Sequence, residues 1–435
     1  MEVQGASDEE AFHRRREQLV VLILAAVQFT TIVDFMIVMP LGPQLMRSLR
    51  IDPAQFGVII SSYTFAAGIA GLIASSVVDR FARRTTFMTL NAGFLLGTLF
   101  CGLAPTYEML VVARIVTGAF GGILGGMAMA IIGDVFPEER RGRATGSLMT
   151  GFALASVAGV PLGQLLGTNF GWHVPFVTLA IAGIPALVLT PFAMPPLDAH
   201  VGNSHEHPLR SLTETFSHAN HLKSFALIVT LMVGSFSVFP YLSVFLVGNI
   251  GITENQLSLL YVAGGVLTLA AAPVVGRLAD RHGKLKVYRI VAPGSALMFV
   301  VLTHLPPVHA GVAIALFGVM MAFNVGRMIP AMAMVTSSVE PRRRGGFLSA
   351  NASLQHVASG IGASIGGAII SESADGKLEH FGTVGWIAAG ATLLSLWLAG
   401  RVRVADGGAT SAEAISLAAA AEASADVGEP LIEAT

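Results

Sequence analysis

Twelve long apolar runs constrain the fold of this chain more than any other feature. An α-helix rises about 1.5 Å per residue, so about 20 apolar residues cross a hydrocarbon core about 30 Å thick. The runs therefore predict an all-α membrane protein with 12 transmembrane helices. Their expected bounds are 18–40, 54–78, 85–103, 107–134, 142–168, 173–195, 222–247, 256–279, 285–305, 309–338, 345–371 and 381–401.

The composition supports an integral membrane protein and excludes other classes. Hydrophobic residues make up 53% of the chain and charged residues 12%, whereas a globular protein carries about 25% charge. With a net charge of -1 and no basic arm, nothing indicates a nucleic-acid partner. The single cysteine, Cys101, excludes a disulfide framework. The expected partners are the lipid bilayer and a small-molecule substrate, and we expect a monomer.

The distribution of basic residues predicts the orientation. Of the 26 Lys and Arg residues, 21 fall in segments on the side of the two termini, and cytoplasmic segments are enriched in these residues. The first apolar run is too long for a signal-peptide core. We therefore expect a multi-pass protein of the cytoplasmic (inner) membrane, with both termini cytoplasmic.

A polar interval divides the chain into two halves of six helices. The expected organisation is an N-terminal segment 1–17, a first bundle 18–195, a central loop 196–221, a second bundle 222–401, and a disordered tail 402–435. His205 and His207 in the central loop could bind a metal, but imidazoles in a polar loop are usually solvated. We expect no metal site.

The two halves are related by an internal repeat. A shift of 201 residues places Ile51 on Ile252, Asp79 on Asp280 and Arg80 on Arg281. The segment "SVVDRFARR" (76–84) follows the second span, and "GRLADRHGK" (276–284) follows the eighth. Two parallel halves of this kind are typical of alternating-access transporters.

These segments resemble the G-x-x-x-D-R-x-G-(R/K) loop of the major facilitator superfamily. The matching residues are Gly276, Asp280, Arg281, Gly283 and Lys284 in the second copy, and Asp79, Arg80, Arg83 and Arg84 in the first. Ser75 and Ala82 replace both glycines in the first copy. The resemblance covers residues 18–401 and implies two pseudo-symmetric six-helix bundles.

The repeated loops are candidates for a cytoplasmic gate. Their aspartate can lie at the N-terminus of a neighbouring helix, and their arginines can pair with carboxylates such as Asp134 or Glu138. Such contacts would latch the two halves while the cavity faces outward. The alternative is that the charges only fix topology, which explains the arginines but not the repeated aspartate.

Charged residues inside the spans are candidates for function because their burial in a membrane is costly. Asp34 lies about 24 Å from the cytoplasmic end of the first helix, and Arg114 lies about 10 Å from the external end of the fourth. Their depths allow an ion pair across the cavity. Burial favours the neutral carboxyl and a nearby arginine favours the carboxylate, so Asp34 could couple transport to protons. Alternatively, Asp34 is only a structural partner.

The resemblance to multidrug members implies cavity roles for both Asp34 and Arg114. Further candidates for the substrate cavity are Gln28, Thr31, Asn324, Arg327, Asn351 and Gln355. Arg327 could instead extend to the cytoplasmic interface, and Asn351, Gln355 and Ser359 could form a hydrogen-bonded seam between helices. Gly118 and Gly122 follow Arg114 on one helix face and predict close helix packing.

The fifth span resembles the antiporter signature of the superfamily. It contains Gly159, Pro161 and Gly163, but Ala155 replaces the first glycine and the proline stands one place late. The form "GVPLG" is similar to that of sugar-efflux and arabinose-efflux permeases. Pro161 predicts a kink, and the small residues allow another helix to approach closely.

These features predict an exporter of a drug, sugar or related metabolite that works by proton antiport, with protons as coupling ion and no other cofactor. The alternative is proton-driven uptake or facilitated diffusion of a sugar or metabolite. An intramembrane enzyme or a receptor is a remote alternative, because the sequence contains no H-E-x-x-H motif and its polar segments are short for the soluble output domain of a receptor. We expect no enzymatic activity.

Overall fold

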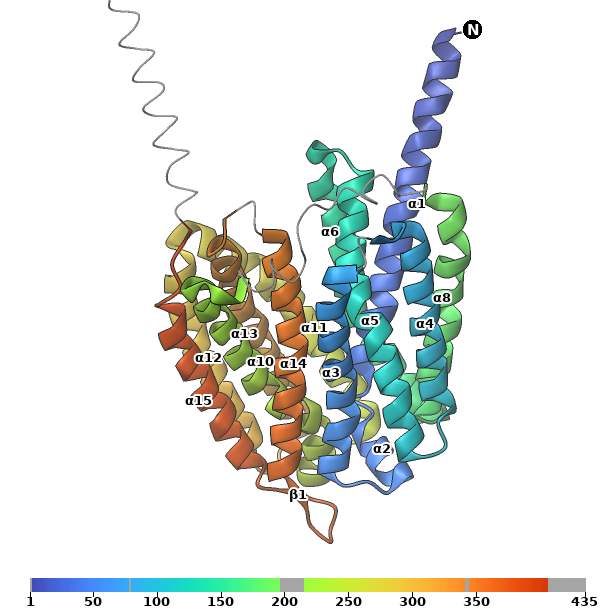
Figure 1. Ribbon diagram of the computed structural model, residues 1–435. Helices are drawn as coiled ribbons and strands as arrows, with labels where there is room; N and C mark the ends of the chain where they lie inside the picture. The colour runs from blue at the N-terminus through green and yellow to red at the C-terminus, as the bar shows by residue number, and fades with distance from the viewer. Residues whose placement is uncertain (1, 78–79, 196–214, 341–343, 406–435) are drawn as a thin grey trace, which may run out of the picture.

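The computed structural model describes residues 2–77, 80–195, 215–340 and 344–405, and almost all of them are helical. Figure 1 shows two helical bundles side by side. Helix α1 begins and helix α15 ends at the same end of the molecule, here called the terminal end, and the opposite end is called the distal end.

The first bundle contains the helices of the N-terminal half. These are α1 (Glu2–Ile37), α2 (Gly42–Leu49), α3 (Pro53–Val77), α4 (Arg83–Leu103), α5 (Tyr107–Val135), α6 (Glu138–Leu154), the π-helical segment η2 (Ala155–Gly159), α7 (Val160–Phe170) and α8 (His173–Ala193). Segments α6, η2 and α7 form one continuous span. The first helix, α1, begins at Glu2, well before position 18, where the first membrane span was expected to begin.

The second bundle repeats this order. It contains α10 (Ala219–Phe245), the π-helical segment η3 (Leu246–Ile250), α11 (Glu254–His282), α12 (Lys284–Thr303), α13 (Ala310–Ser337), α14 (Arg344–Ile369), the short strands β1 (Ser371–Glu372) and β2 (Leu378–Glu379), and α15 (Phe381–Ala399). Helices α3 and α11 begin 201 residues apart, as the repeat predicts. Helix α13 is continuous through Arg327 and Pro330.

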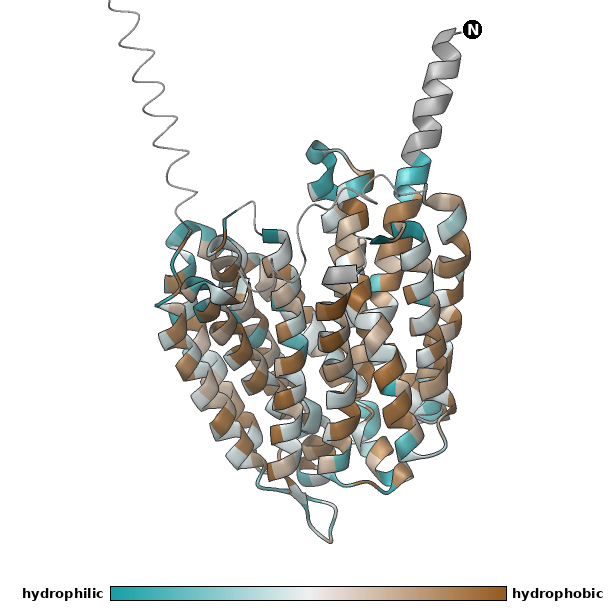
Figure 2. Ribbon diagram, in the orientation of Figure 1, coloured by the Kyte–Doolittle hydropathy of each residue, from teal (hydrophilic) through white to brown (hydrophobic). Residues whose placement is uncertain are grey.

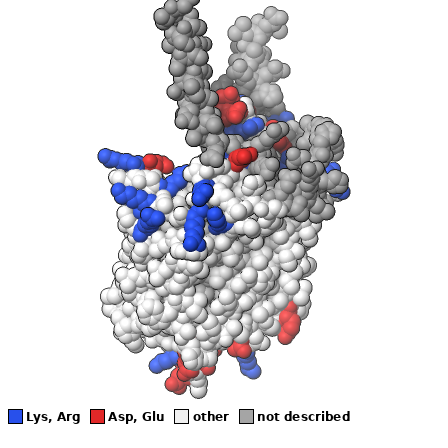
Figure 3. Space-filling model, turned by 60° about the vertical axis from the view of Figure 1, so that its left-hand side comes forward, with Lys and Arg blue, Asp and Glu red and all other residues white. Residues whose placement is uncertain are grey.

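The described helices form a membrane-spanning protein. Eleven of them are long and apolar enough to cross a membrane. Helix α14 has 26 residues and completes the twelfth position, although it is rich in Gly, Ser and Asn. Many large hydrophobic side chains are exposed, and hydrophobic residues recur along the helices in Figure 2. On the face shown in Figure 3, Lys and Arg lie at the two ends and none lies on the broad band between them. The predicted fold class is confirmed.

The bundles meet along two helix pairs. Helix α3 packs along α14, and the span α6–α7 packs against α11. Glycines make both contacts close: a Cβ at Gly68 would lie 2.8 Å from the Ser353 carbonyl oxygen, and one at Gly265 would lie 3.0 Å from the Val157 Cα. In addition, α1 and α10 of the two bundles contact each other through the rings of Phe35 and Phe236.

Several predicted features lie outside the described residues. These are Asp79 of the first loop, His205 and His207, most of the central loop, and the tail from position 406. Among the residues that are described, no cluster of three or more His, Cys, Asp or Glu side chains is arranged to hold a metal.

Candidate functional site

The described part of the spans buries three charged side chains. Asp34 on α1 is 0% exposed, Arg114 on α5 is 1% exposed, and Arg327 on α13 is 2% exposed. Asp34 is the only fully buried carboxylate among the described residues. Each arginine lies inside its own bundle, so each half has one buried arginine among the described residues.

Asp34 and Arg114 form a buried ion pair in the first bundle. The Arg114 Nη1 atom donates to Asp34 Oδ2 at 2.8 Å, and Thr98 Oγ1 on α4 donates to Asp34 Oδ1 at 3.1 Å. The ion pair that we considered from helix depth is present. It is enclosed by the bundle, however, and does not cross an open cavity, because neither side chain is accessible.

An aromatic side chain completes this site. The Arg114 guanidinium carbon lies 4.3 Å from the centre of the Tyr63 ring on α3, within the range of a cation–π interaction. Gly118 permits this arrangement, since a Cβ there would lie 2.3 Å from the Tyr63 carbonyl oxygen. Asp34 was recognisable from the sequence as a charge in an apolar run. Thr98 and Tyr63 gave no such signal.

Arg327 occupies a site without a carboxylate in the second bundle. Its Nη2 donates to Ser235 Oγ at 2.7 Å and to Asn324 Oδ1 at 2.9 Å, and its Nη1 donates to Thr392 Oγ1 at 2.7 Å. The Phe299 ring lies 5.1 Å from the guanidinium. Arg327 is therefore held inside the bundle by three helices and does not extend to the interface.

The two sites approach each other where the bundles meet. Phe35 stacks on Tyr63 at 5.3 Å between ring centres and contacts Phe236 of α10 at 5.8 Å. Phe35 follows Asp34 in sequence, and Phe236 follows Ser235. A line of aromatic rings thus connects the Arg114 site to the residue beside the Arg327 site.

The other predicted cavity residues lie in different settings. Gln28 is half-buried beside Gly125 of α5, and Thr31 is half-buried with its hydroxyl donating to the Val27 carbonyl. Asn351 is buried and Gln355 is half-buried on α14. Among the described residues, Asn351 and Gln355 make no side-chain hydrogen bond to another helix. The hydrogen-bonded seam that we considered for α14 is therefore not formed.

The fifth span has the irregular backbone that its proline predicts. Pro161 lacks an N–H, and the turn before it is the π-helical segment η2. Helix α1 packs closely against the two glycines: a Cβ at Gly159 would lie 2.3 Å from Val33, and one at Gly163 would lie 2.6 Å from Ile37. The small residues thus bring α1 to the irregular segment.

The motif residues at the terminal end contact their own bundles. Arg83 pairs with Asp134 at the end of α5. Lys284 donates to Ser337 Oγ at 2.6 Å, while Asp280 and Arg281 are exposed, as is Arg80. Arg84 donates to the Met194 carbonyl at 3.4 Å. These described contacts stay within one half each and do not join the two bundles.

The glycines of the motif differ between the copies. Gly283 has φ +91, a conformation that residues with a Cβ rarely adopt, and it precedes α12. Ala82 takes its place before α4 with φ -57 and ψ 123. The first copy therefore makes a different turn. Gly276 has open space around it and is not needed for a close approach.

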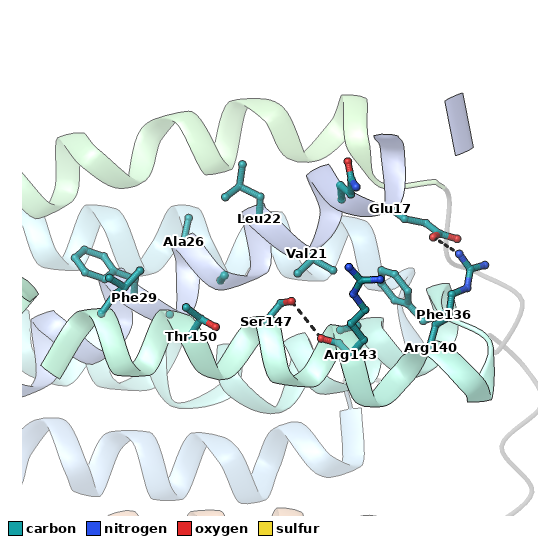
Figure 4. A pocket seen from close by; sticks show the side chains of 15 residues that line it. Glu17, Val21, Leu22, Ala26, Phe29, Phe136, Arg140, Arg143, Ser147 and Thr150 are labelled. Atoms are coloured by element: carbon teal, nitrogen blue, oxygen red, sulfur yellow. Dashed lines mark hydrogen bonds and ion pairs between the residues drawn. The ribbon is translucent and has the colours of Figure 1, made fainter. Parts of the chain in front are cut away.

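The described ion pair between the two halves lies at the distal end. Glu254 at the start of α11 pairs with Arg47 of α2, and it also accepts a hydrogen bond from Gln44 Nε2 at 2.8 Å. A cavity of about 710 Å³ lies between α1 and α6 of the first bundle, and the Glu17–Arg140 pair and Arg143 are among its lining residues (Figure 4). The predicted cavity residues do not line it.

We expect Glu254→Gln to loosen the distal junction. An exposed ion pair contributes about 0.2–1 kcal/mol. Its loss should therefore shift the equilibrium between the closed and the open distal end by at most about fivefold. Labelling of a cysteine introduced at the buried position Ser258 by a membrane-impermeant maleimide should become faster. Equal labelling rates with and without the Glu254 substitution would contradict a closing role for this pair.

Comparison with known families identifies the chain. The family model of the Major Facilitator Superfamily matches residues 24–248 and, a second time, residues 224–425. The chain belongs to this superfamily. It is therefore a membrane transporter, and the resemblance found in the repeated loops is confirmed at this level.

Members of the superfamily from two bacteria resemble the chain over most of its length. The Inner membrane transport protein YdhP of Escherichia coli (strain K12) is 26% identical over 370 residues, covering 83% of this chain and 91% of that protein. The Uncharacterized MFS-type transporter YbcL of Bacillus subtilis (strain 168) is 25% identical over 368 residues, covering 84% and 92%.

Two solved structures of the superfamily share the fold. A point mutant of the nucleoside transporter NupG superimposes with a TM-score of 0.69 and 14% identity, covering 89% of this chain and 99% of that chain. A bacterial homologue of the human lysosomal transporter Spinster, in an inward-facing and unoccupied conformation, gives a TM-score of 0.63 and 14% identity, covering 89% and 95%.

Proposed function

We propose that this transporter exports a small molecule across the bacterial inner membrane in exchange for protons, with both termini in the cytoplasm. The observation that carries the proposal is the enclosed Asp34–Arg114 ion pair, whose carboxylate is the only fully buried one among the described residues. An ionisable group inside the membrane is costly, so a functional role is the default interpretation. The related Escherichia coli protein is named as an inner membrane transport protein.

Protonation of Asp34 would break the ion pair. Thr98 and the Tyr63 ring would still contact the two partners, but the charge attraction between α1 and α5 would be lost. Helix α1 also carries Phe35, which contacts the second bundle. A change at Asp34 can therefore affect a contact between the two bundles.

The coupling gains energy from the membrane potential. One proton that crosses inward gains about 2.3 kcal/mol per 100 mV, in addition to the contribution of the pH gradient. With cytoplasmic termini, the distal end, where Arg47 and Glu254 join the two halves, is external. In a state that opens this end, the exposed Asp280 and Arg281 would become available to latch the terminal ends.

The fifth span supports exchange. Gly159 and Gly163 bring α1 against the segment that contains Pro161, and the same span packs on α11 of the other bundle. This contact connects the helix that carries Asp34 to one of the two seams between bundles. A closely packed seam of this kind would resist opening without substrate, which an exchanger requires.

A pH-gradient assay tests the direction of transport. Everted membrane vesicles that contain the transporter are energised, and a panel of sugars, nucleosides, amino acids and drugs is added. In everted vesicles, export carries substrate from the medium into the acidic lumen, and the exchanged protons leave the lumen. We therefore expect at least one class of substrate to dissipate the gradient. Substrate flux that is indifferent to the gradient would reject antiport in favour of facilitated diffusion.

A further inference from the structure

Arg327 is a buried cation whose contacts are all neutral. Its hydrogen bonds go to Ser235, Asn324 and Thr392, and no Asp or Glu in the described part of the chain forms an ion pair with it. A guanidinium that is 2% exposed has lost most of its hydration, and neutral hydroxyl and amide groups only partly replace a counterion. The site therefore retains an unbalanced positive charge.

The repeat shows which position could have supplied the counterion. Ser235 lies 201 residues after Asp34, which is the offset of the two halves. In the first bundle this position is a carboxylate that neutralises Arg114. In the second it is a hydroxyl that accepts a hydrogen bond from Arg327 but carries no charge. The two sites together carry one positive charge in excess when Asp34 is ionised, and two when it is protonated.

The Arg327 site lies beside the aromatic contact between the two bundles. Phe236 follows Ser235 and contacts Phe35 of the other bundle, and Asn324 is half-exposed. Asn324 Oδ1 accepts hydrogen bonds from both Nε and Nη2 of Arg327, at 3.2 and 2.9 Å. An incoming anion that displaced this amide oxygen would meet two donors side by side, the arrangement that suits a carboxylate.

We propose that Arg327 binds a carboxylate of the transported molecule, so that the substrates are organic acids and not cationic drugs. The proposal rests on the proposed transport function and specifies its substrate class. A cationic substrate would find two buried arginines and one carboxylate that is already paired. An organic acid would supply the charge that the second bundle lacks.

Matched acids and neutral analogues test the substrate class. Purified full-length protein in detergent is titrated at constant ionic strength with benzoate against benzamide, and with glucuronate against glucose, and the shift in Tm is measured. Sodium sulfate at the same ionic strength distinguishes an inorganic anion from an organic acid. We expect one or both acids to raise Tm, with no shift for the neutral partner or for sulfate.

Two variants at one position test the assignment to Arg327. Ser235→Asp places a carboxylate beside the guanidinium, and Ser235→Asn is its neutral isostere. We expect the acid to bind Ser235→Asp at least about tenfold more weakly than Ser235→Asn, because the internal carboxylate takes its place. If Ser235→Asp does not fold, Arg327→Gln should lose the preference for acid over neutral analogue.

The outcomes separate this inference from proton coupling. Equal acid affinity in the two Ser235 variants, a Tm increase with the neutral analogue as large as with its acid, no shift with either acid, or a shift with sulfate alone would overturn the inference. The titration uses no pH gradient. Acid binding without proton exchange would therefore reject the proposed antiport and retain the substrate class. Proton exchange without acid binding would retain the antiport and reject the substrate class.

Discussion

Replacing Asp34 with Asn is expected to abolish proton exchange. Asparagine has the shape of aspartate and keeps an oxygen that can accept from Thr98 and Arg114, but it does not take up or release a proton. Purified variants reconstituted in liposomes with an imposed pH gradient should therefore show no proton movement when substrate is added. Proton exchange at the wild-type rate in Asp34→Asn would eliminate Asp34 as the coupling residue.

A double variant separates coupling from stability. Asp34→Asn leaves Arg114 buried without its partner, and breaking a buried ion pair typically costs about 3–5 kcal/mol. The Tm of the single variant should fall accordingly. Asp34→Asn combined with Arg114→Gln removes both charges, so we expect Tm to recover in part while proton exchange stays absent. Recovery of exchange along with Tm would mean that the single variant failed through instability alone.

The spans and their pairing into halves were predictable because the bilayer imposes a length on every helix. All twelve runs became helices, and the offset of 201 residues was retained in the starts of α3 and α11. The first helix extended beyond its apolar run to Glu2, because hydropathy marks the membrane crossing and not the helix end. The hairpin of β1 and β2 has only two-residue strands, too short to produce an alternating pattern.

The buried charges were predictable as sites, but their partners were not. Asp34 and Arg114 stood out because charge is rare in a membrane span, and comparable depth indicated that they could meet. Thr98 and Tyr63 are ordinary residues of membrane helices, and only the packing of α3, α4 and α5 shows that they contact the pair. For the same reason, depth alone left open whether Arg327 lines a cavity or extends to the interface, whereas the structure shows that Ser235 and Thr392 hold it inside the bundle.

The two halves differ in sequence at the repeat position of the buried carboxylate. The halves share helix order and loop motif, yet Ser235 replaces the carboxylate of Asp34. Packing of the backbone does not require this difference, because both side chains accept a hydrogen bond from a buried arginine. The two arginines are not related by this offset, since Arg327 lies 213 residues after Arg114. The halves therefore hold two different buried sites: an ion pair in one bundle and an unbalanced cation in the other.

The contact between α3 and α5 supports the first of these sites, and Gly118→Ala is expected to disrupt it. The added methyl group would lie 2.3 Å from the Tyr63 carbonyl oxygen and 2.9 Å from its Cα, so the two backbones must separate. Overpacking of this kind costs about 1–3 kcal/mol, and backbone atoms have little freedom to yield. Tyr63 would also move from Arg114, so exchange should weaken together with Tm.

The same substitution at Gly126 is a matched control on the same helix. Apart from the neighbouring backbone of its own helix, no atom lies within 4 Å of a Cβ built at Gly126. Alanine favours a helix over glycine by up to about 1 kcal/mol. Gly126→Ala should therefore keep or raise Tm and leave exchange unchanged, while Gly118→Ala lowers both. Equal Tm values for the two variants would show that α3 and α5 can separate at little cost, and the rigid support that we infer for the Arg114 site would be wrong.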